Sequence, residues 1–218
     1  MWLLLPPGLW RLLEAARLPA WRQCRVSRTS HQSIITTAIM LQVTAAIVLL
    51  LCIQCQAVDI KEQENFDENK FMGKWFGIIA VSNCPVFNLM KKDMTMPIIG
   101  FEKDGNTMKS SVAFKTAQGC QQMDSTMEIV DSGHYKHTSV HGDNEVMILK
   151  TDYTSYAMEY TKTIHDGHQC ITLKLYGRTT ELPEIIKKTF MTGIHTMGLT
   201  DEDAVVLPGG ADCELKGY

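Results

Sequence analysis

The chain has 218 residues, 45 % of them hydrophobic, which is enough for one domain with a sizeable core. Of its 21 basic and 24 acidic residues, five and one lie before residue 58, so residues 58–218 carry 16 basic and 23 acidic side chains. The resulting net charge of −7 argues against a nucleic-acid partner, because phosphates need an excess of Lys and Arg.

Residues 34–57 form an uncharged apolar stretch that differs from the rest of the chain. Five arginines precede it, and it ends in the small-residue sequence Cys55-Gln56-Ala57. This order is typical of a secretory signal peptide. We therefore expect a leader over 1–57, with an upstream extension at 1–39 and a signal peptide at 40–57, and a secreted domain over 58–218 with no stable membrane anchor after cleavage. A transmembrane anchor is the alternative, since the stretch is long enough to span a bilayer.

The region from 74 to 178 consists of short runs of β-forming residues separated by turn signals. We expect eight strands, at Lys74–Ser82, Thr95–Glu102, Met108–Lys115, Ser125–Val130, His134–Val140, Glu145–Thr151, Tyr156–Thr163 and Cys170–Arg178. Their spacing of roughly a dozen residues is typical of a barrel or a sandwich. Ala204–Leu207 is a candidate ninth strand.

The hydrophobic pattern changes after the last of these strands. From Thr180 to Ile194 the apolar residues recur at intervals of three and four, which predicts an amphipathic helix. We expect it to pack on the strand face that carries Tyr156, Met158 and Tyr160, because two apolar faces of one small domain bury each other.

Four cysteines follow residue 57, namely Cys84, Cys120, Cys170 and Cys213. Secretion would permit disulfides, and four cysteines allow three complete pairings. The cysteines lack the spacing of a metal site, so none is expected. Eleven methionines also follow residue 57; they suit either an adaptable binding surface or an ordinary core.

Three separated motifs stand out between residues 65 and 179. The first is the segment from Asn65 to Phe76, which contains Gly73-Lys74-Trp75; the second is Thr151-Asp152-Tyr153; the third is Leu175-Tyr176-Gly177-Arg178-Thr179. They occur in order at the ends of the expected strands, and together they resemble the motifs of the lipocalin family. The resemblance implies an all-β fold, an eight-stranded antiparallel up-and-down barrel with one C-terminal helix. Such a barrel is either filled by its side chains or holds one small ligand.

The motif residues have structural roles in this interpretation. Gly73 allows the turn into the first strand. Trp75 is expected to plug the closed end of the barrel, with Arg178 against its indole as a cation–π pair whose donors reach backbone carbonyls.

Within the family the chain is most similar to the alpha-1-microglobulins, on strings such as Gln63-Glu64-Asn65-Phe66, Cys84-Pro85 and Lys174-Leu175-Tyr176-Gly177-Arg178. That resemblance implies a Cys120–Cys213 disulfide. It also implies a free, redox-active thiol at Cys84 near the open end of the barrel. A Cys84–Cys170 disulfide is the alternative, since the turn before Cys170 lies at the same end.

The candidate ligand-binding residues are Cys84, Lys162, Lys174, Glu159, His165 and His168. If Arg178 points into the barrel, strand alternation turns Lys174 inward as well, where it could pair with a carboxylate such as a haem propionate. Glu159 would then neutralise Lys174, which is the competing interpretation. The two histidines precede Cys170, where they either ligate haem iron or are merely solvated.

The sequence therefore predicts a secreted carrier or scavenger of a small hydrophobic ligand, with haem or a related chromophore as the first candidate and no obligatory cofactor. No catalytic motif stands out, so an enzyme is not expected. Two alternatives depend on Cys84, a thiol-dependent reductase or radical scavenger and a protein disulfide-linked to plasma partners.

Overall fold

The computed structural model describes residues 40–43, 60–209 and 212–218. The chain divides into two units, 1–57 and 58–218. Apart from residues 40–43, the expected upstream extension and signal peptide lie outside the described residues. In the described ranges no helix is long and apolar enough to cross a membrane.

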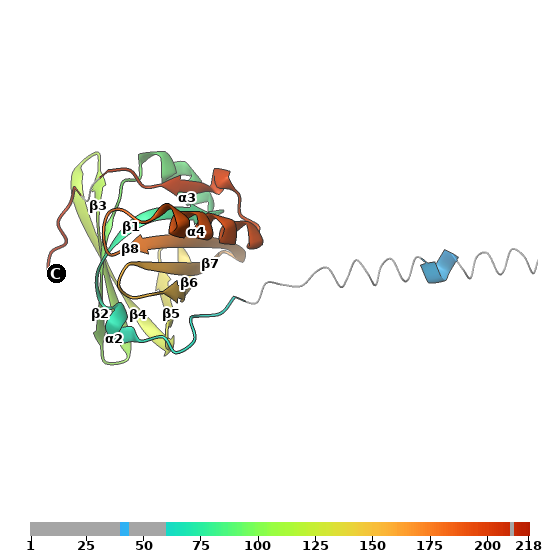
Figure 1. The fold of residues 1–218 in the computed structure, drawn as a ribbon, viewed down its shortest axis with the longest axis horizontal. Coiled ribbons are helices and arrows are strands. Elements are labelled where there is room, and N and C mark those ends of the chain that lie inside the picture. The colour runs from blue at the N-terminus through green and yellow to red at the C-terminus, as the bar shows by residue number, and fades with distance from the viewer. Residues whose placement is uncertain (1–39, 44–59, 210–211) are drawn as a thin grey trace, which may run out of the picture. The chain divides into compact units, whose positions relative to one another are not determined.

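The second unit is an antiparallel β-barrel with short helices at its ends and one longer helix outside (Figure 1). Its strands are β1 Gly73–Ser82, β2 Ile98–Asp104, β3 Thr107–Thr116, β4 Gly119–Asp131, β5 His134–Ser139, β6 Gly142–Thr151, β7 Tyr156–His165, β8 His168–Gly177 and β9 Ala204–Val206. Each of β2 to β7 pairs with the strand that follows it in the chain, and β1 pairs with both β8 and β2. That double pairing closes the barrel, and β9 adds to the β1 edge. The predicted fold class is confirmed.

Most strand boundaries differ from the predicted ones by a few residues. β2 begins at Ile98 because Pro97 has no N–H for a ladder, while its carbonyl accepts from the N–H of Gly77. β4 begins six residues earlier than expected, because Gly119 belongs to the tight turn that joins it directly to β3.

Two short helices lie at opposite ends of the barrel, α2 Glu68–Phe71 and α3 Pro85–Met90 (Figure 1). Asp67 caps α2 by accepting from the N–H groups of Asn69 and Lys70. Pro85 starts the helical turn of α3 directly after Cys84, because proline suits the first position of a helix. One end of the barrel therefore carries α2, capped by Asp67, and the other carries α3, started by Pro85.

The longer helix, α4 Glu184–Thr196, packs against the outside of the barrel at β8 (Figure 1). Phe190 and Ile194 are its buried residues, and the cluster they join includes Tyr160, with Tyr156 and Met158 at its margin. The predicted docking face is confirmed.

The methionines belong mostly to cores. Met96, Met158, Met191 and Met197 pack in the cluster outside the barrel. Met108 and Met127 lie in a second cluster, inside the barrel. Met108 and Met127 are therefore buried methionines of the barrel interior.

Candidate ligand-binding site

The barrel is sealed at the end that carries α2. Trp75 is fully buried, and its indole N–H donates to the Phe71 carbonyl at 2.8 Å. The Arg178 guanidinium lies 3.7 Å from the centre of the Trp75 ring. Its nitrogens donate to the carbonyls of Lys70, Phe71, Met72, Lys74 and Tyr153. One side chain therefore ties together the first strand, α2 and the β6–β7 turn.

The Thr151-Asp152-Tyr153 motif forms that β6–β7 turn. The Asp152 carboxylate accepts from the N–H groups of Thr154, Ser155 and Tyr156. Burial by itself would raise the pKa of Asp152, but these bonds and one from the Ser155 hydroxyl lower it. Tyr153 adopts a positive φ of 66°. Its hydroxyl accepts from the N–H of Asp67 at 2.9 Å, which joins the turn to α2. The motif residues stabilise the closed end and do not face a ligand.

An apolar cluster fills the barrel above this seal. It contains Phe71, Trp75, Ile99, Phe101, Met108, Met127, Tyr135, Val146, Ile148, Ala157 and Tyr176. Towards the open end, the inward positions become polar. They include Ser82, Thr172 and Lys174 on one side, and Glu159, Thr161 and Thr163 on the other.

Glu159 and Lys174 form the centre of this polar region. They are opposite each other in the β7–β8 register, and the Lys174 ammonium lies 2.7 Å from a Glu159 oxygen. The same oxygen accepts from the Thr161 hydroxyl at 3.0 Å, and the second oxygen accepts from the Tyr176 hydroxyl at 2.8 Å. Glu159 is 3 % exposed, whereas the Lys174 side chain is 40 % exposed. The competing interpretation, a neutralised pair inside the barrel, matches this geometry.

Two further interior residues, His137 and Tyr135, were not singled out from the sequence. Burial and the Lys174 charge lower the pKa of His137, while the Glu159 charge opposes them. Tyr135 is 1 % exposed, and its hydroxyl has no hydrogen-bond partner among the described residues. The alternation of β5 placed Tyr135 and His137 on one face, but did not say that this face was the inner one.

Lys162 does not belong to the interior, which corrects its assignment as a ligand-binding residue. It is opposite Glu145 in the β6–β7 register, and its ammonium lies 3.8 Å from a Glu145 oxygen on the outer face. His134 and Lys136 also contact that carboxylate. The neighbouring position, Thr163, is the buried one, and its hydroxyl donates to Asn144 at 2.9 Å.

His165 and His168 lie on the β7–β8 turn at the open end. They are opposite each other across the turn, and both are exposed. His165 is 3.5 Å from the Asp166 carboxylate. Within the described ranges, no group of three or more His, Cys, Asp or Glu could hold a metal ion.

Cys84 is bonded to Cys170, with a Cα–Cα distance of 5.1 Å. The expectation of a free Cys84 thiol is therefore wrong in this structure. The strand ends β1 and β8 are neighbours, so register brings the two cysteines together at the open end. Cys120 is bonded to Cys213, the pairing that the family resemblance implied. It fixes the C-terminal segment, where Leu215 packs on the outer face of β2 and β3.

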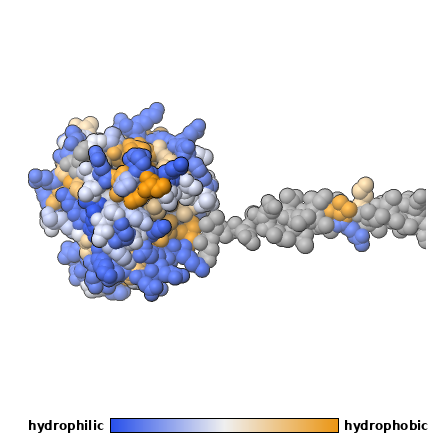
Figure 2. Space-filling model, viewed as in Figure 1, coloured by the Kyte–Doolittle hydropathy of each residue, from blue (hydrophilic) through white to orange (hydrophobic). Residues whose placement is uncertain are grey.

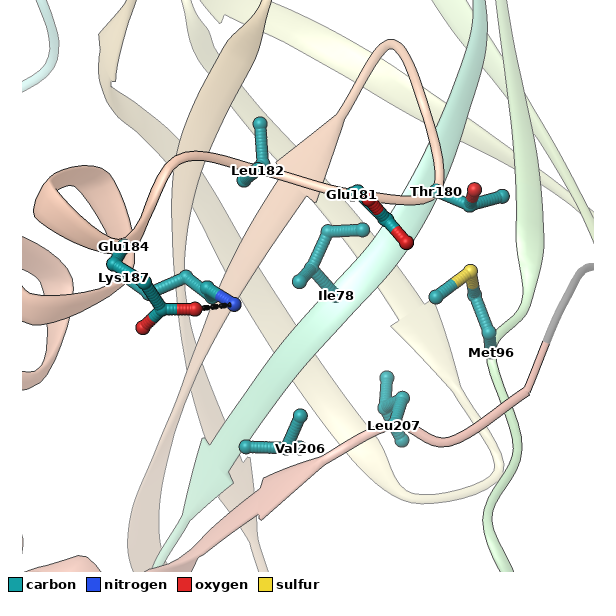
Figure 3. Close-up of a pocket in the computed structure, with 9 residues that line it drawn as sticks. All are labelled: Ile78, Met96, Thr180, Glu181, Leu182, Glu184, Lys187, Val206 and Leu207. Atoms are coloured by element: carbon teal, nitrogen blue, oxygen red, sulfur yellow. Dashed lines mark ion pairs between the residues drawn. The ribbon is translucent and has the colours of Figure 1, made fainter.

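A separate hollow of about 370 Å³ lies outside the barrel, between the start of α4, β9 and β1 (Figure 3). Its walls include Ile78, Leu182 and Leu207, with the Glu184–Lys187 ion pair at one side. Figure 2 shows apolar side chains gathered on the face that carries α4. Ile185 and Val206 are among the exposed apolar residues there. The residues that line this hollow include neither Glu159 nor Lys174.

A closed antiparallel barrel with one sealed end, an apolar base and polar groups higher up defines a calyx-type binding protein. The family model described as "Lipocalin / cytosolic fatty-acid binding protein family" matches residues 72–209. The chain belongs to this family, whose members bind small hydrophobic ligands in the barrel.

Three comparisons place the chain within the family. It is 42 % identical over 172 residues to the olfactory protein of Lithobates pipiens, covering 78 % of this chain and 97 % of that protein. It is 29 % identical over 189 residues to Protein AMBP of Bos taurus, covering 76 % of this chain but 51 % of that protein. Protein AMBP is the alpha-1-microglobulin relative, so at this identity the likeness to alpha-1-microglobulin is only approximate. The solved structure of the siderocalin Ex-FABP, described as functioning through dual ligand specificities, is 27 % identical with a TM-score of 0.60, over 68 % of this chain and 97 % of that one.

Proposed function

We propose that this protein is an extracellular, non-enzymatic carrier of a small hydrophobic ligand, held in the barrel above the Trp75 seal. The observation that carries the proposal is the change of lining along the interior. Apolar side chains fill the base, whereas the region around Lys174 is polar and part-exposed. A binding site of this kind combines apolar walls with a few placed polar groups.

Two features support an extracellular location. Both pairs of cysteines in the barrel are oxidised, and such disulfides persist in secretory compartments. The leader pattern that ends at Ala57 is that of a secretory signal.

The carrier proposal is tested by filling the calyx. Ala80 is a small interior residue opposite Lys174 in the β1–β8 register. In the full chain, Ala80→Trp should abolish binding of the fluorescent apolar probe 1-aminoanthracene, because the new ring occupies the ligand volume. Ile185→Trp is the matched control, since Ile185 is 70 % exposed on α4. Equal probe binding by both folded variants would contradict the proposal, as would no binding by the unmodified chain.

Haem or a related chromophore remains a candidate ligand. The Lys174 ammonium is part-exposed and could contact a propionate at the open end, although the propionate would have to compete with Glu159 for that charge. Haemin titration should then give a Soret shift that Lys174→Met weakens at least tenfold. Lys162→Met should have no effect, because Lys162 lies on the outer face. The absence of a Soret shift would exclude haem but not a carrier of other ligands.

Thiol chemistry is not part of the proposed function. A reductase, a radical scavenger or a protein disulfide-linked to plasma partners each needs Cys84 as a thiolate. In the structure that sulfur is bonded to Cys170.

The relative at 42 % identity is named an olfactory protein. Small, volatile, uncharged molecules therefore belong in the ligand panel alongside haemin.

A further inference from the structure

The Tyr135 hydroxyl is the one buried side-chain polar atom of the described residues without a hydrogen-bond partner. Buried polar groups are nearly always paired, and an unpaired one weakens the fold. Tyr135 lies on β5, opposite Val146, among the apolar side chains of the barrel interior. Its hydroxyl is therefore placed where the deep end of a bound ligand would lie.

The surroundings of Tyr135 define the chemistry of its missing partner. Burial, followed by the charges of Glu68 and Glu159, raises the pKa of Tyr135 well above its usual value. The phenol thus keeps its proton at physiological pH and acts as a donor. Glu68 and Glu159 are already paired with Lys103 and Lys174, so an anionic acceptor at Tyr135 would be buried among apolar side chains without a cation of its own.

The nearby cation does not reverse that preference. Lys174 is already paired with Glu159, whose second oxygen is occupied by Tyr176. A ligand carboxylate would have to compete with Glu159 for the lysine, at a cost in desolvation.

The interior can adjust to admit a ligand atom beside Tyr135. Met108 and Met127 are opposite each other in the β3–β4 register and belong to the same cluster as Tyr135. Methionine side chains are unbranched and flexible, so they can yield to a ligand at small cost.

We propose that the calyx selects an uncharged apolar ligand with one hydrogen-bond acceptor, such as a ketone, and that the Tyr135 hydroxyl donates to it, in preference to the carboxylate of similar length. This inference rests on the proposed carrier function and names the ligand class of the same site.

The test compares three ligands of equal carbon number in competition with 1-aminoanthracene on the full chain: 2-dodecanone, dodecanoic acid and dodecane. The ketone should bind at least tenfold more tightly than the acid and the alkane. Tyr135→Phe should remove the advantage over the alkane while leaving alkane binding unchanged. Tyr160→Phe is the matched control, because Tyr160 is also buried but belongs to the cluster that α4 covers outside the barrel.

A second measurement does not depend on ligand. Removal of an unpaired buried hydroxyl should leave the melting temperature of the ligand-free protein unchanged or raised in Tyr135→Phe. A lowered melting temperature would overturn the inference, since it would mean that the hydroxyl is already partnered. Equal binding of the three ligands, or a ketone preference that survives in Tyr135→Phe, would also overturn it. Those outcomes leave the carrier function intact, whereas failure of the probe itself to bind would contradict the carrier function.

Discussion

The Glu159 carboxylate and the Lys174 ammonium lie 2.7 Å apart inside the barrel, on adjacent strands. The carboxylate is almost fully buried, whereas the ammonium faces the open end and is part-exposed. The buried carboxylate therefore depends on its partner more than the part-exposed ammonium does. This difference can be tested by removing each charge in turn.

Removing Lys174 should destabilise the protein. Lys174→Met leaves a buried carboxylate with only two hydroxyl donors, which should lower the free energy of unfolding by about 1–3 kcal/mol. The double variant Glu159→Gln/Lys174→Met should recover most of this loss, because no buried charge is left. Urea unfolding of the two single variants and the double variant measures the coupling. Lys162→Met, which removes an outer-face partner of Glu145, is the control and should change stability by less than about 0.5 kcal/mol. Additive effects of the two single substitutions would contradict a coupled pair.

Arg178→Lys should lower the melting temperature without changing ligand affinity. Lysine cannot stack flat on the Trp75 indole or reach the separate carbonyls of α2, β1 and the β6–β7 turn. The lost contacts should reduce the free energy of unfolding by about 2–4 kcal/mol. Thermal melts and probe titration below both melting temperatures separate the two effects. An unchanged melting temperature would mean that the Trp75–Arg178 contact does not hold the closed end together.

The cysteine pairing predicts the outcome of thiol mapping. Alkylation of the native protein without reductant should leave Cys84, Cys120, Cys170 and Cys213 unlabelled, and peptide mass spectrometry should recover Cys84 linked to Cys170. Native labelling at Cys84 would restore the free-thiol interpretation. The paired substitution Cys84→Ser/Cys170→Ser should cost about 2–4 kcal/mol, because the bond closes a long loop with a separation of 86 residues.

His137 should make the protein less stable in mild acid. Burial and the Lys174 charge lower its pKa, so the folded state favours the neutral ring. The unfolded chain takes up the proton first as the pH falls below about 6.5, and stability declines from there until the folded-state pKa is passed. His137→Gln should remove this part of the pH dependence, while His141→Gln, on the exposed β5–β6 turn, should not. NMR titration of the ring checks the direction, since a pKa at or above the usual value would contradict the prediction.

Local sequence predicted most of the fold because its signals act over a few residues. Alternation of apolar and polar residues together with glycine turns placed β1 to β8, and three-four spacing placed α4. The boundaries that were missed depend on partners elsewhere. One example is the start of β2, where the Pro97 carbonyl bonds to Gly77.

The candidate site was predicted only in part, for a related reason. Alternation states which residues share a face, and it correctly grouped Lys174 with Arg178. It does not state which face is the inner one, and beyond a β-bulge the residues that face inward switch to the other set of alternate positions. The β1–β8 register, for example, shifts between Gly77 and Ile79. Alternation within β7 is regular, so Glu159, Thr161 and Thr163 face inward and Lys162 faces outward.

The sequence by itself determined the family, the barrel and the residues of its sealed end, because strand alternation, turn residues and the motifs around Trp75 and Arg178 are local patterns. The tertiary structure decided the chemistry of the interior. Strand register brought Cys84 to Cys170 and Glu159 to Lys174, and it left the Tyr135 hydroxyl without a partner among the described residues. These outcomes depend on which residues strand pairing sets opposite each other, at sequence separations of 15 for Glu159 and Lys174 and 86 for Cys84 and Cys170.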